Sequence, residues 1–358
     1  AATASAPAKS PIASIVSAAA GGASIPAEEA SAVRRTLAEL DRRVSRWLTA
    51  VLHSPQVQAL EAAWRSLAFL VSHTEFRKGL RLSLLHAPSA QLADRFRSLL
   101  IDPVFDEGAA TPDLIVCDYQ FGNSATDMEA LDELAQHGAS LPAVVLAGVS
   151  PGFFGIKQAW QVPTLPALVS MFDQWQFAKW KTLRGQPYAR SLGVVFGRCL
   201  LRAPYGREES ADLELVYREE CGSDKDLVWA GGPIAAATAV SRSVADTGWP
   251  TAMAGYVHGR VEGFTTAQGG AKGDKKFGPT DTQMPQPKIE ELTEVGINAD
   301  VGLRDQDDAI VWNGLTAARP RHRRSDPRRS APVGDDAGGA DAAVCGGVAG
   351  AATPAGVV

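Results

Sequence analysis

The sequence predicts an α/β protein, in which N-terminal helices precede a mixed β-sheet core with flanking helices. Three observations predict this fold class. Apolar residues recur every three to four positions through residues 28–78, as on one face of a helix. Strand-like and helix-like segments then alternate through residues 79–250, which is typical of a sheet covered by helices. Both patterns weaken over residues 251–318, and the segments 1–27 and 319–358 have the composition of disordered tails.

The charge and hydropathy of the chain exclude several classes of partner. The 358 residues carry a net charge of −5, which gives no overall attraction to nucleic acid or to an anionic membrane. No apolar run is long enough to span a bilayer, so we expect no membrane insertion. The first residues lack a basic stretch before a solid apolar one, so we expect no signal peptide.

The cysteines and histidines suggest neither a disulfide framework nor a metal site. The four cysteines, Cys117, Cys199, Cys221 and Cys345, form no C-x-x-C pair, and the six histidines have no metal-ligand spacing. A reducing compartment therefore fits the chain best, and we predict no structural zinc site and no cofactor.

The N-terminal tail contains one short segment that can form a helix. Residues 11–20 begin with a proline, which is well tolerated in a first helical turn. Ile12, Ile15 and Val16 then form a small apolar stripe. Two interpretations stay open, a frayed tail or a peptide that docks into the groove of a partner.

Two amphipathic helices are predicted next. The first covers residues 28–54, where a stripe of apolar side chains lies opposite charged ones. Ser54 and Pro55 are the expected cap and first residue of the second helix.

The second helix carries an unusual pair, Trp64-Arg65, at its midpoint. Trp64 lies four positions after Leu60 and three before Leu67, so the spacing predicts that it faces the core as an apolar anchor. Arg65 is predicted to lie on the helix edge, where it can pair with a carboxylate or a carbonyl from another element. The alternative for the pair is a contact between subunits.

The middle of the chain alternates strands and helices, in an order that predicts a parallel or mixed sheet. One of the expected helices is rich in small residues, as in helices that pack closely inside a core. Strands are expected over residues 80–87, 112–121 and 142–150 and within 190–204. Helices are expected over residues 89–102, 124–140, 165–184 and 226–248, the last being the small-residue helix.

The pattern is weak beyond residue 251. Residues 269–288 are predicted to form a Gly/Lys/Pro-rich loop, and residues 289–315 to form two short strands around a turn. The six arginines within residues 319–329 have no aromatic residues between them, so we expect a solvated basic tail and no nucleic-acid site. The Ala/Gly/Val-rich remainder has no periodicity and is expected to be disordered.

One motif looks catalytic. Gly148-Val149-Ser150-Pro151-Gly152 is a G-x-S-x-G sequence after an apolar strand, as in the nucleophile elbow of α/β-hydrolases. In that elbow the N–H of the residue after the serine forms half of the oxyanion hole, and Pro151 has no N–H. Proline also disfavours the strained backbone that the serine needs. We therefore predict that the chain is not an enzyme and keep a hydrolase at Ser150 as the alternative.

Five blocks in a fixed order carry a resemblance to one family. They lie between about residues 37 and 250 and include "LHSPQVQALEAAWRSLAFLVSHTEFR", "DYQFGNSATDMEALDEL", "SPGFFGIKQAWQVPTL", "FAKWKTLRGQPYARSLGVVFGRCLLRAPYG" and "LVWAGGPIAAATAVSRSVADTGWP". Together they resemble the large sheath subunit of the bacterial type VI secretion system (the TssC, VipB or EvpB family). The resemblance then fades, and the strand-rich closing portion of the family is not found.

The resemblance implies a structural subunit of a contractile sheath in the bacterial cytoplasm. Such a subunit would pair with a small sheath subunit of the TssB/VipA type and stack with other copies into a helical tube around an inner tube protein. Contraction of that tube would drive effector delivery. A AAA+ disassembly ATPase of the ClpV type would recognise the helix near the N-terminus, where Ile12, Ile15 and Val16 are the expected contacts.

Within the matching blocks, large or charged side chains are the expected structural or intersubunit contacts. They are Trp64, Arg65, Phe76, Phe153, Phe154, Trp180, Arg202 and Trp229.

The divergent C-terminal segment leaves a further alternative. A sheath paralogue that no longer assembles would fit the missing family-like portion, and the Arg/Pro/Ala/Gly-rich tail has a composition that a truncated or frame-shifted reading would produce.

Overall fold

The computed structural model describes residues 27–88, 91–106, 108–206, 217–269, 275–302, 308–312, 317–318 and 356–357. The predicted helix of residues 11–20, with Ile12, Ile15 and Val16, therefore lies outside the described residues. So does the arginine-rich segment of residues 319–329.

The centre of the molecule is a mixed eight-stranded sheet with the strand order β1-β12-β2-β3-β4-β10-β11-β7. The strands from β1 through β10 in that order pair in parallel, whereas β11 pairs antiparallel with both β10 and β7. The prediction of a mixed sheet is confirmed. The strands are β1 (Arg81–Leu82), β2 (Leu114–Phe121), β3 (Val144–Val149), β4 (Leu192–Phe196), β7 (Arg260–Val261), β10 (Asn298–Gly302), β11 (Ala309–Trp312) and β12 (Gly356–Val357).

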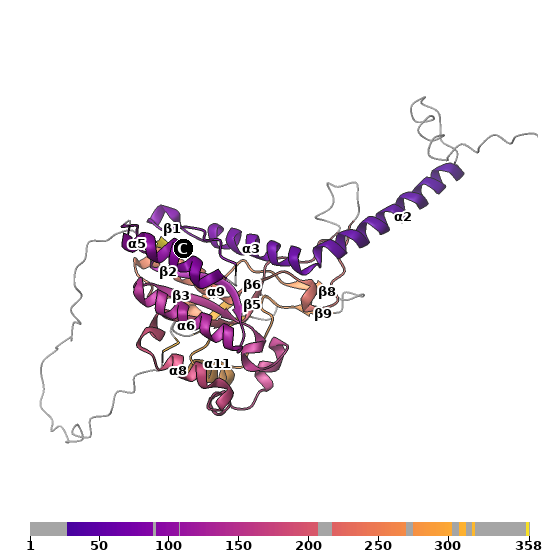
Figure 1. Ribbon diagram of the computed structural model, residues 1–358. Coiled ribbons are helices and arrows are strands. Elements are labelled where there is room, and N and C mark those ends of the chain that lie inside the picture. Colours follow the sequence, from indigo (N-terminus) through magenta and orange to yellow (C-terminus); the bar gives the residue numbers. More distant parts are fainter. Residues whose placement is uncertain are drawn as a thin grey trace, which may run out of the picture.

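Both faces of the sheet are covered by helices, as the continuously apolar central strands require (Figure 1). Alternate residues of β3 show the division, because Val145 and Ala147 belong to one core and Leu146 to the other. The first core lies under α6 (Ala125–Ser140), which Ser124 caps by accepting a hydrogen bond from the Asp127 N–H. The second core contains α9 (Gly232–Thr247).

Helix α9 confirms the expectation of a closely packed small-residue helix, although it begins later than predicted. Most of its residues are buried, and a side chain at Gly232 would meet the Gly197 carbonyl oxygen at 2.9 Å. The residues before it, β6 (Trp229–Gly231), pair antiparallel with β5 (Arg198–Leu200). The predicted helix of residues 226–248 was therefore too long at its start, because strand pairing takes precedence over helix propensity there.

Several other predicted elements are shorter or broken in the structure. The predicted strand of residues 80–87 is reduced to the two residues of β1. The predicted helix of residues 165–184 is interrupted between α7 (Leu168–Phe172) and α8 (Ala178–Arg184), where Phe172 and Phe177 stack with ring centroids 4.3 Å apart. The remaining elements of this part are α4 (Leu92–Phe96), a π-helical turn (Arg97–Ile101), α5 (Asp102–Asp106), and the 3₁₀ turns Pro151–Phe154, Ala159–Thr164, Trp175–Phe177 and Pro187–Ser191.

The segment beyond residue 251 has more structure than its sequence predicted. Part of the expected loop forms a hairpin of β8 (Ala267–Gly269) and β9 (Lys275–Phe277). A helix, α11 (Gln286–Glu294), starts inside the predicted loop and runs into the segment where only two strands were expected. The two predicted strands are present as β10 and β11, which pair antiparallel. A short helix, α10 (Gly255–His258), precedes β7.

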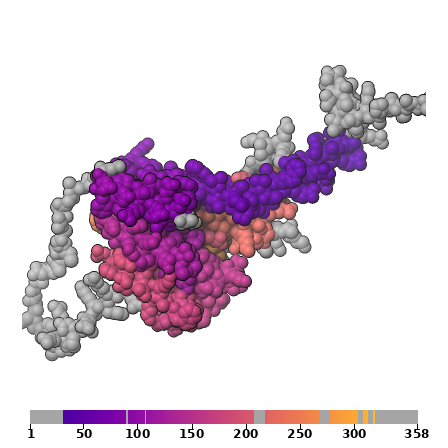
Figure 2. All heavy atoms as spheres, in the orientation of Figure 1, coloured from indigo at the N-terminus to yellow at the C-terminus, as the bar shows by residue number. Residues whose placement is uncertain are grey.

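Two helices form the N-terminal part, as predicted. They are α2 (Ala27–Leu52) and α3 (Pro55–Ser72), followed by a 3₁₀ turn (Phe76–Lys78). Helix α3 lies against the body, whereas α2 extends away from it as a single rod (Figures 1 and 2). None of the described helices combines the length and the hydropathy that crossing a membrane would need.

Candidate functional site

The chain changes direction between α2 and α3, and this junction is fixed by its sequence. Helix α2 ends at Leu52 and α3 begins at Pro55, whose missing N–H and fixed φ suit a first helical position. Ser54 has the extended backbone of an N-cap, but its hydroxyl donates to the Val51 carbonyl oxygen at 2.8 Å and makes no capping bond. The predicted proline start is confirmed, and the predicted side-chain cap is wrong.

Residues 202–206 and 217–226, here called the junction segment, hold both helices. Tyr217 contacts Thr49 near the end of α2, with 3.0 Å between the two hydroxyl oxygens. His53, between the helices, is 3.0 Å from Glu219 through its Nε2 atom. Further along, the Gln58 side chain of α3 donates to the Lys225 carbonyl oxygen at 2.8 Å. The junction segment therefore sets the direction in which α2 leaves the body.

Arg202 lies at the centre of these contacts and is 7% exposed. Its guanidinium donates to Glu61 of α3 at 2.6 Å and to Glu219 of the junction segment at 2.6 Å. Burial alone would lower the pKa of Arg202, but the hydrogen bonds that it donates to Glu219 and Glu61 outweigh this effect, so the pKa is raised. The group stays charged, and the guanidinium also lies 4.3 Å from the ring centroid of Tyr205.

Arg65 completes this network from α3. Its Nε donates to Glu61 at 2.7 Å, one helical turn earlier, and an Nη atom donates to the Tyr205 hydroxyl at 3.0 Å. Burial opposes ionisation of Glu61, but hydrogen bonds from Arg202 and Arg65 hold its pKa below the ordinary value. Arg65 does pair with a carboxylate, but that carboxylate lies on its own helix. The group that it reaches on another element is the Tyr205 hydroxyl, so the predicted pairing with a carboxylate or carbonyl of another element is wrong. Glu61, Arg65, Arg202, Tyr205 and Glu219 are called the junction network below.

Trp64 does not face the core, contrary to the prediction. Its side chain is 61% exposed, and that of Leu60 is 60% exposed. Helix α3 turns Ser66 and Leu70 toward the body instead, on the side where Glu61 accepts from Arg202 and Arg65 donates to Tyr205. The polar network, which apolar spacing does not reveal, decides which face of the helix is buried.

The apolar stripe of α2 is also exposed. Trp47 is 72% exposed, and its apolar neighbours along the helix are at least one-third exposed. Figure 2 shows that the described part of this helix extends into free space beyond the body. These exposed side chains are Leu37, Leu40, Val44, Trp47, Leu48 and Val51.

The other residues singled out from the sequence are mostly buried. Phe153, Phe154 and Trp180 belong to one group of rings with Phe172, Phe177 and Phe196, here called the aromatic cluster. The Trp180 indole N–H donates to the Val295 carbonyl oxygen at 3.0 Å.

Trp229 and Phe76 lie outside the aromatic cluster. Trp229 is buried and donates to the Asp224 carbonyl oxygen at 2.7 Å. Phe76 is 44% exposed, on the short turn after α3. Most of these residues therefore pack inside a single chain, where they stabilise its fold.

Ser150 lacks the surroundings of a nucleophile. Its backbone is extended, at φ −83° and ψ 166°, and its hydroxyl donates to the Phe121 carbonyl oxygen at 3.3 Å. None of the hydrogen bonds found within the described part of the chain joins Ser150 to a histidine. The arrangement offers no general base to activate the hydroxyl.

A cavity of about 640 Å³ beside the β8–β9 hairpin also lacks catalytic chemistry. Its acids Asp281 and Asp224 already face Arg198, at 2.7 Å and 3.6 Å, and that guanidinium lies over the Trp229 ring. Its described lining includes no histidine or cysteine. The cavity therefore shows no nucleophile and base in contact.

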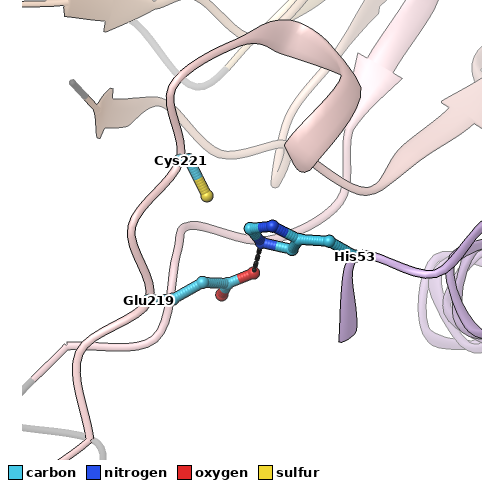
Figure 3. Close-up of side chains that lie close together, drawn as sticks. All are labelled: His53, Glu219 and Cys221. Carbon is cyan, nitrogen blue, oxygen red and sulfur yellow. Dashed lines mark hydrogen bonds and ion pairs between the residues drawn. The ribbon is translucent and has the colours of Figure 1, made fainter. Parts of the chain in front are cut away.

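Sequence spacing did not reveal one group of side chains that could bind a metal ion. His53, Glu219 and Cys221 come together at the junction, although 166 positions separate the first two (Figure 3). Burial, and then the charges of Glu219 and Asp226, raise the pKa of the Cys221 thiol to about 12. His53 belonged to a matching block, whereas Glu219 and Cys221 lie between two of the blocks, and no local pattern relates them to His53.

Comparison with known proteins assigns the chain to a family. The profile of the VipB family, described as EvpB/VC_A0108, tail sheath N-terminal domain, matches residues 34–318. The type VI secretion system sheath protein TssC1 of Pseudomonas aeruginosa is 28% identical over 311 residues. That match covers 80% of this chain and 62% of the relative, so the chain spans less than two thirds of the length of the relative. The match to the family profile covers most of the chain, and the chain therefore belongs to the VipB/EvpB family of tail sheath proteins.

Proposed function

We propose that the chain is the large structural subunit of a type VI secretion sheath in the bacterial cytoplasm and does not act as an enzyme. Its partners would be a small sheath subunit, further copies of itself, and an inner tube protein. The family match supports this assignment, and the exposed apolar face of α2 is the observation that carries it.

The exposed face of α2 has the pattern of a helix that pairs with another helix. Successive apolar residues are separated alternately by four and three positions, which is the seven-residue repeat of a coiled coil. Three of these residues are valines, and two of them, Val44 and Val51, occupy the a position, where β-branched residues favour two-stranded coiled coils. The residues of this repeat, here called the α2 seam, are Val33, Leu37, Leu40, Val44, Trp47 and Val51.

The seam points away from the contact that fixes α2. Thr49, which contacts Tyr217, occupies the position of the repeat that lies opposite the apolar positions. The charged residues that flank the seam are Arg34, Asp41 and Arg43, so basic charge predominates there. We therefore propose that the small sheath subunit supplies an amphipathic helix with acidic flanks that packs on this seam.

Co-expression tests this interface. The chain is produced with a small sheath subunit encoded beside it, and the product is viewed by negative-stain electron microscopy. Wild type should form long tubes. Leu40→Glu, which puts a charge in the seam, should abolish them, whereas Ala38→Glu, on the flank of the same helix, should leave them intact. Tubes formed by Leu40→Glu would contradict the proposed interface. Soluble heterodimers from wild type would mean a sheath paralogue that no longer assembles.

The disassembly ATPase is the last proposed partner. By its position near the N-terminus, the segment with Ile12, Ile15 and Val16 is the proposed recognition helix. A peptide of residues 1–27 should bind such an ATPase, and the Ile15→Asp peptide should not.

A further inference from the structure

We propose that His53, Glu219 and Cys221 form a binding site for a divalent transition-metal ion of the zinc class. The three donor atoms, a ring nitrogen, a carboxylate oxygen and a sulfur, all lie within 4.8 Å of one another. In Figure 3 the sulfur of Cys221 points toward the imidazole of His53, which contacts the carboxylate of Glu219. Two different parts of the chain therefore place three metal-binding side chains at one point.

The mixture of donors selects the class of ion. Nitrogen and sulfur together suit zinc and its neighbours, whereas magnesium and calcium need oxygen ligands. Bonds of about 2.0–2.3 Å in a tetrahedral site put ligand atoms roughly 3.3–3.8 Å apart. His53 Nε2 and Glu219 Oε1 are 3.0 Å apart, so a small separation of these two atoms and an inward movement of the sulfur admit the ion.

The ligands already have the outer partners that metal sites use. Asp226 Oδ1 lies 3.7 Å from Nδ1 of His53, on the side of the ring away from Glu219. The second oxygen of Glu219 is held by Arg202 at 2.6 Å and by the Tyr205 N–H at 3.0 Å. These contacts fix both side chains. Oε1 of Glu219 also accepts from Arg202 at 3.2 Å, and this donor stays beside the carboxylate when the ion takes the place of the His53 contact.

The charges around the junction also favour a cation. Among the described residues of the junction network and Asp226 beside it, negative charge exceeds positive charge. Three carboxylates face two guanidinium groups; they are those of Glu61, Glu219 and Asp226 and of Arg65 and Arg202. Binding forms a metal–sulfur bond and releases the thiol proton of Cys221 to solvent. The divalent ion and the thiolate together then add one positive charge, which balances the remaining carboxylate.

A bound ion would brace the junction directly. His53 lies between α2 and α3, and the other two ligands lie on the junction segment. The ion would therefore replace one hydrogen bond between these parts by coordinate bonds.

Cobalt titration of the purified full-length chain tests the proposal, because a cobalt–thiolate bond gives a charge-transfer absorption band. Wild type should bind one Co²⁺ with this band, release a proton, and lose the band when Zn²⁺ is added. Cys221→Ser should lose the band, and His53→Ala should bind at least about 100-fold more weakly. Asp226→Asn should keep the band with binding about 10–100-fold weaker.

Two variants serve as matched controls, Cys117→Ala for the number of thiols and His258→Ala for the number of imidazoles. Both should titrate like wild type, and circular dichroism should show that every variant is folded. Absence of the thiolate band from wild type would overturn the proposal, and so would an unchanged band in Cys221→Ser. The wild-type titration decides the question even where a variant does not fold.

Discussion

The aromatic cluster and the α2 seam are both sets of large apolar side chains, but the described part of the chain covers only the cluster. In the cluster, Phe153 lies 5.2 Å from Trp180 and Phe154 lies 5.0 Å from Phe196, measured between ring centroids, and all are buried. In the seam, side chains such as Leu40 and Trp47 are half exposed or more. The difference teaches that apolar spacing predicts an element, whereas what covers its apolar face depends on the rest of the chain and on partners.

The largest expected effect comes from opening the aromatic cluster. Trp180→Ala removes a fully buried ring and its hydrogen bond to Val295, so it should lower the free energy of unfolding by about 3–5 kcal/mol. Urea unfolding followed by fluorescence measures this loss. Trp175→Ala is the matched control, because that ring is 87% exposed on a neighbouring turn. If both variants lost the same free energy of unfolding, the distinction between buried and exposed aromatic side chains would be contradicted.

Removal of the cation from the junction network should have the next largest effect. Arg202→Met leaves Glu61 and Glu219 without their shared guanidinium, at a cost of about 3 kcal/mol near neutral pH. Because uncompensated buried carboxylates take up protons, the destabilisation should shrink as the pH is lowered. Urea unfolding at neutral and mildly acidic pH measures both effects. A loss that does not change with pH would mean that the arginine acts through packing alone.

Replacing Glu61 should have a smaller effect on the free energy of unfolding, and this effect should depend on pH. Arg202 and Arg65 overcome the opposing effect of burial and lower its pKa in the fold, so the charged form stabilises the protein above the ordinary pKa of 4.5. This stabilisation is lost as the pH falls through the lowered pKa. Glu61→Gln should therefore cost on the order of 1 kcal/mol at pH 7 and progressively less in acid. Parallel urea unfolding curves of the two proteins across this range provide the measurement.

The smallest expected effect on stability belongs to the α2 seam. Trp47→Ala removes a side chain that is 72% exposed, so unfolding of the isolated chain should change by no more than about 0.5 kcal/mol. Its effect should appear only with a partner, as fewer tubes after co-expression with the small subunit. A large loss of stability in the isolated chain would show that the seam is covered within the chain.

The sequence predicted the mixed sheet and both N-terminal helices because their apolar periods are long and regular. It placed Trp64 wrongly because α3 buries the side that meets Arg202, and Arg202 and its partner Glu219 lie about 140 or more positions along the chain from the helix. The group around Cys221 was not foreseen for the same reason, since no local spacing relates it to His53. Helix α11 was missed where prolines obscured its start.

Helix α2 can also be considered as a lever. Its 26 residues span about 39 Å at 1.5 Å per residue, and the contacts near Thr49 and His53, within the described residues, hold it at one end. A rotation of about 10° at that end moves the far tip by roughly 7 Å. Adjustments of less than an ångström among the side chains of the junction are thereby converted into displacements larger than the diameter of a side chain at the distal end.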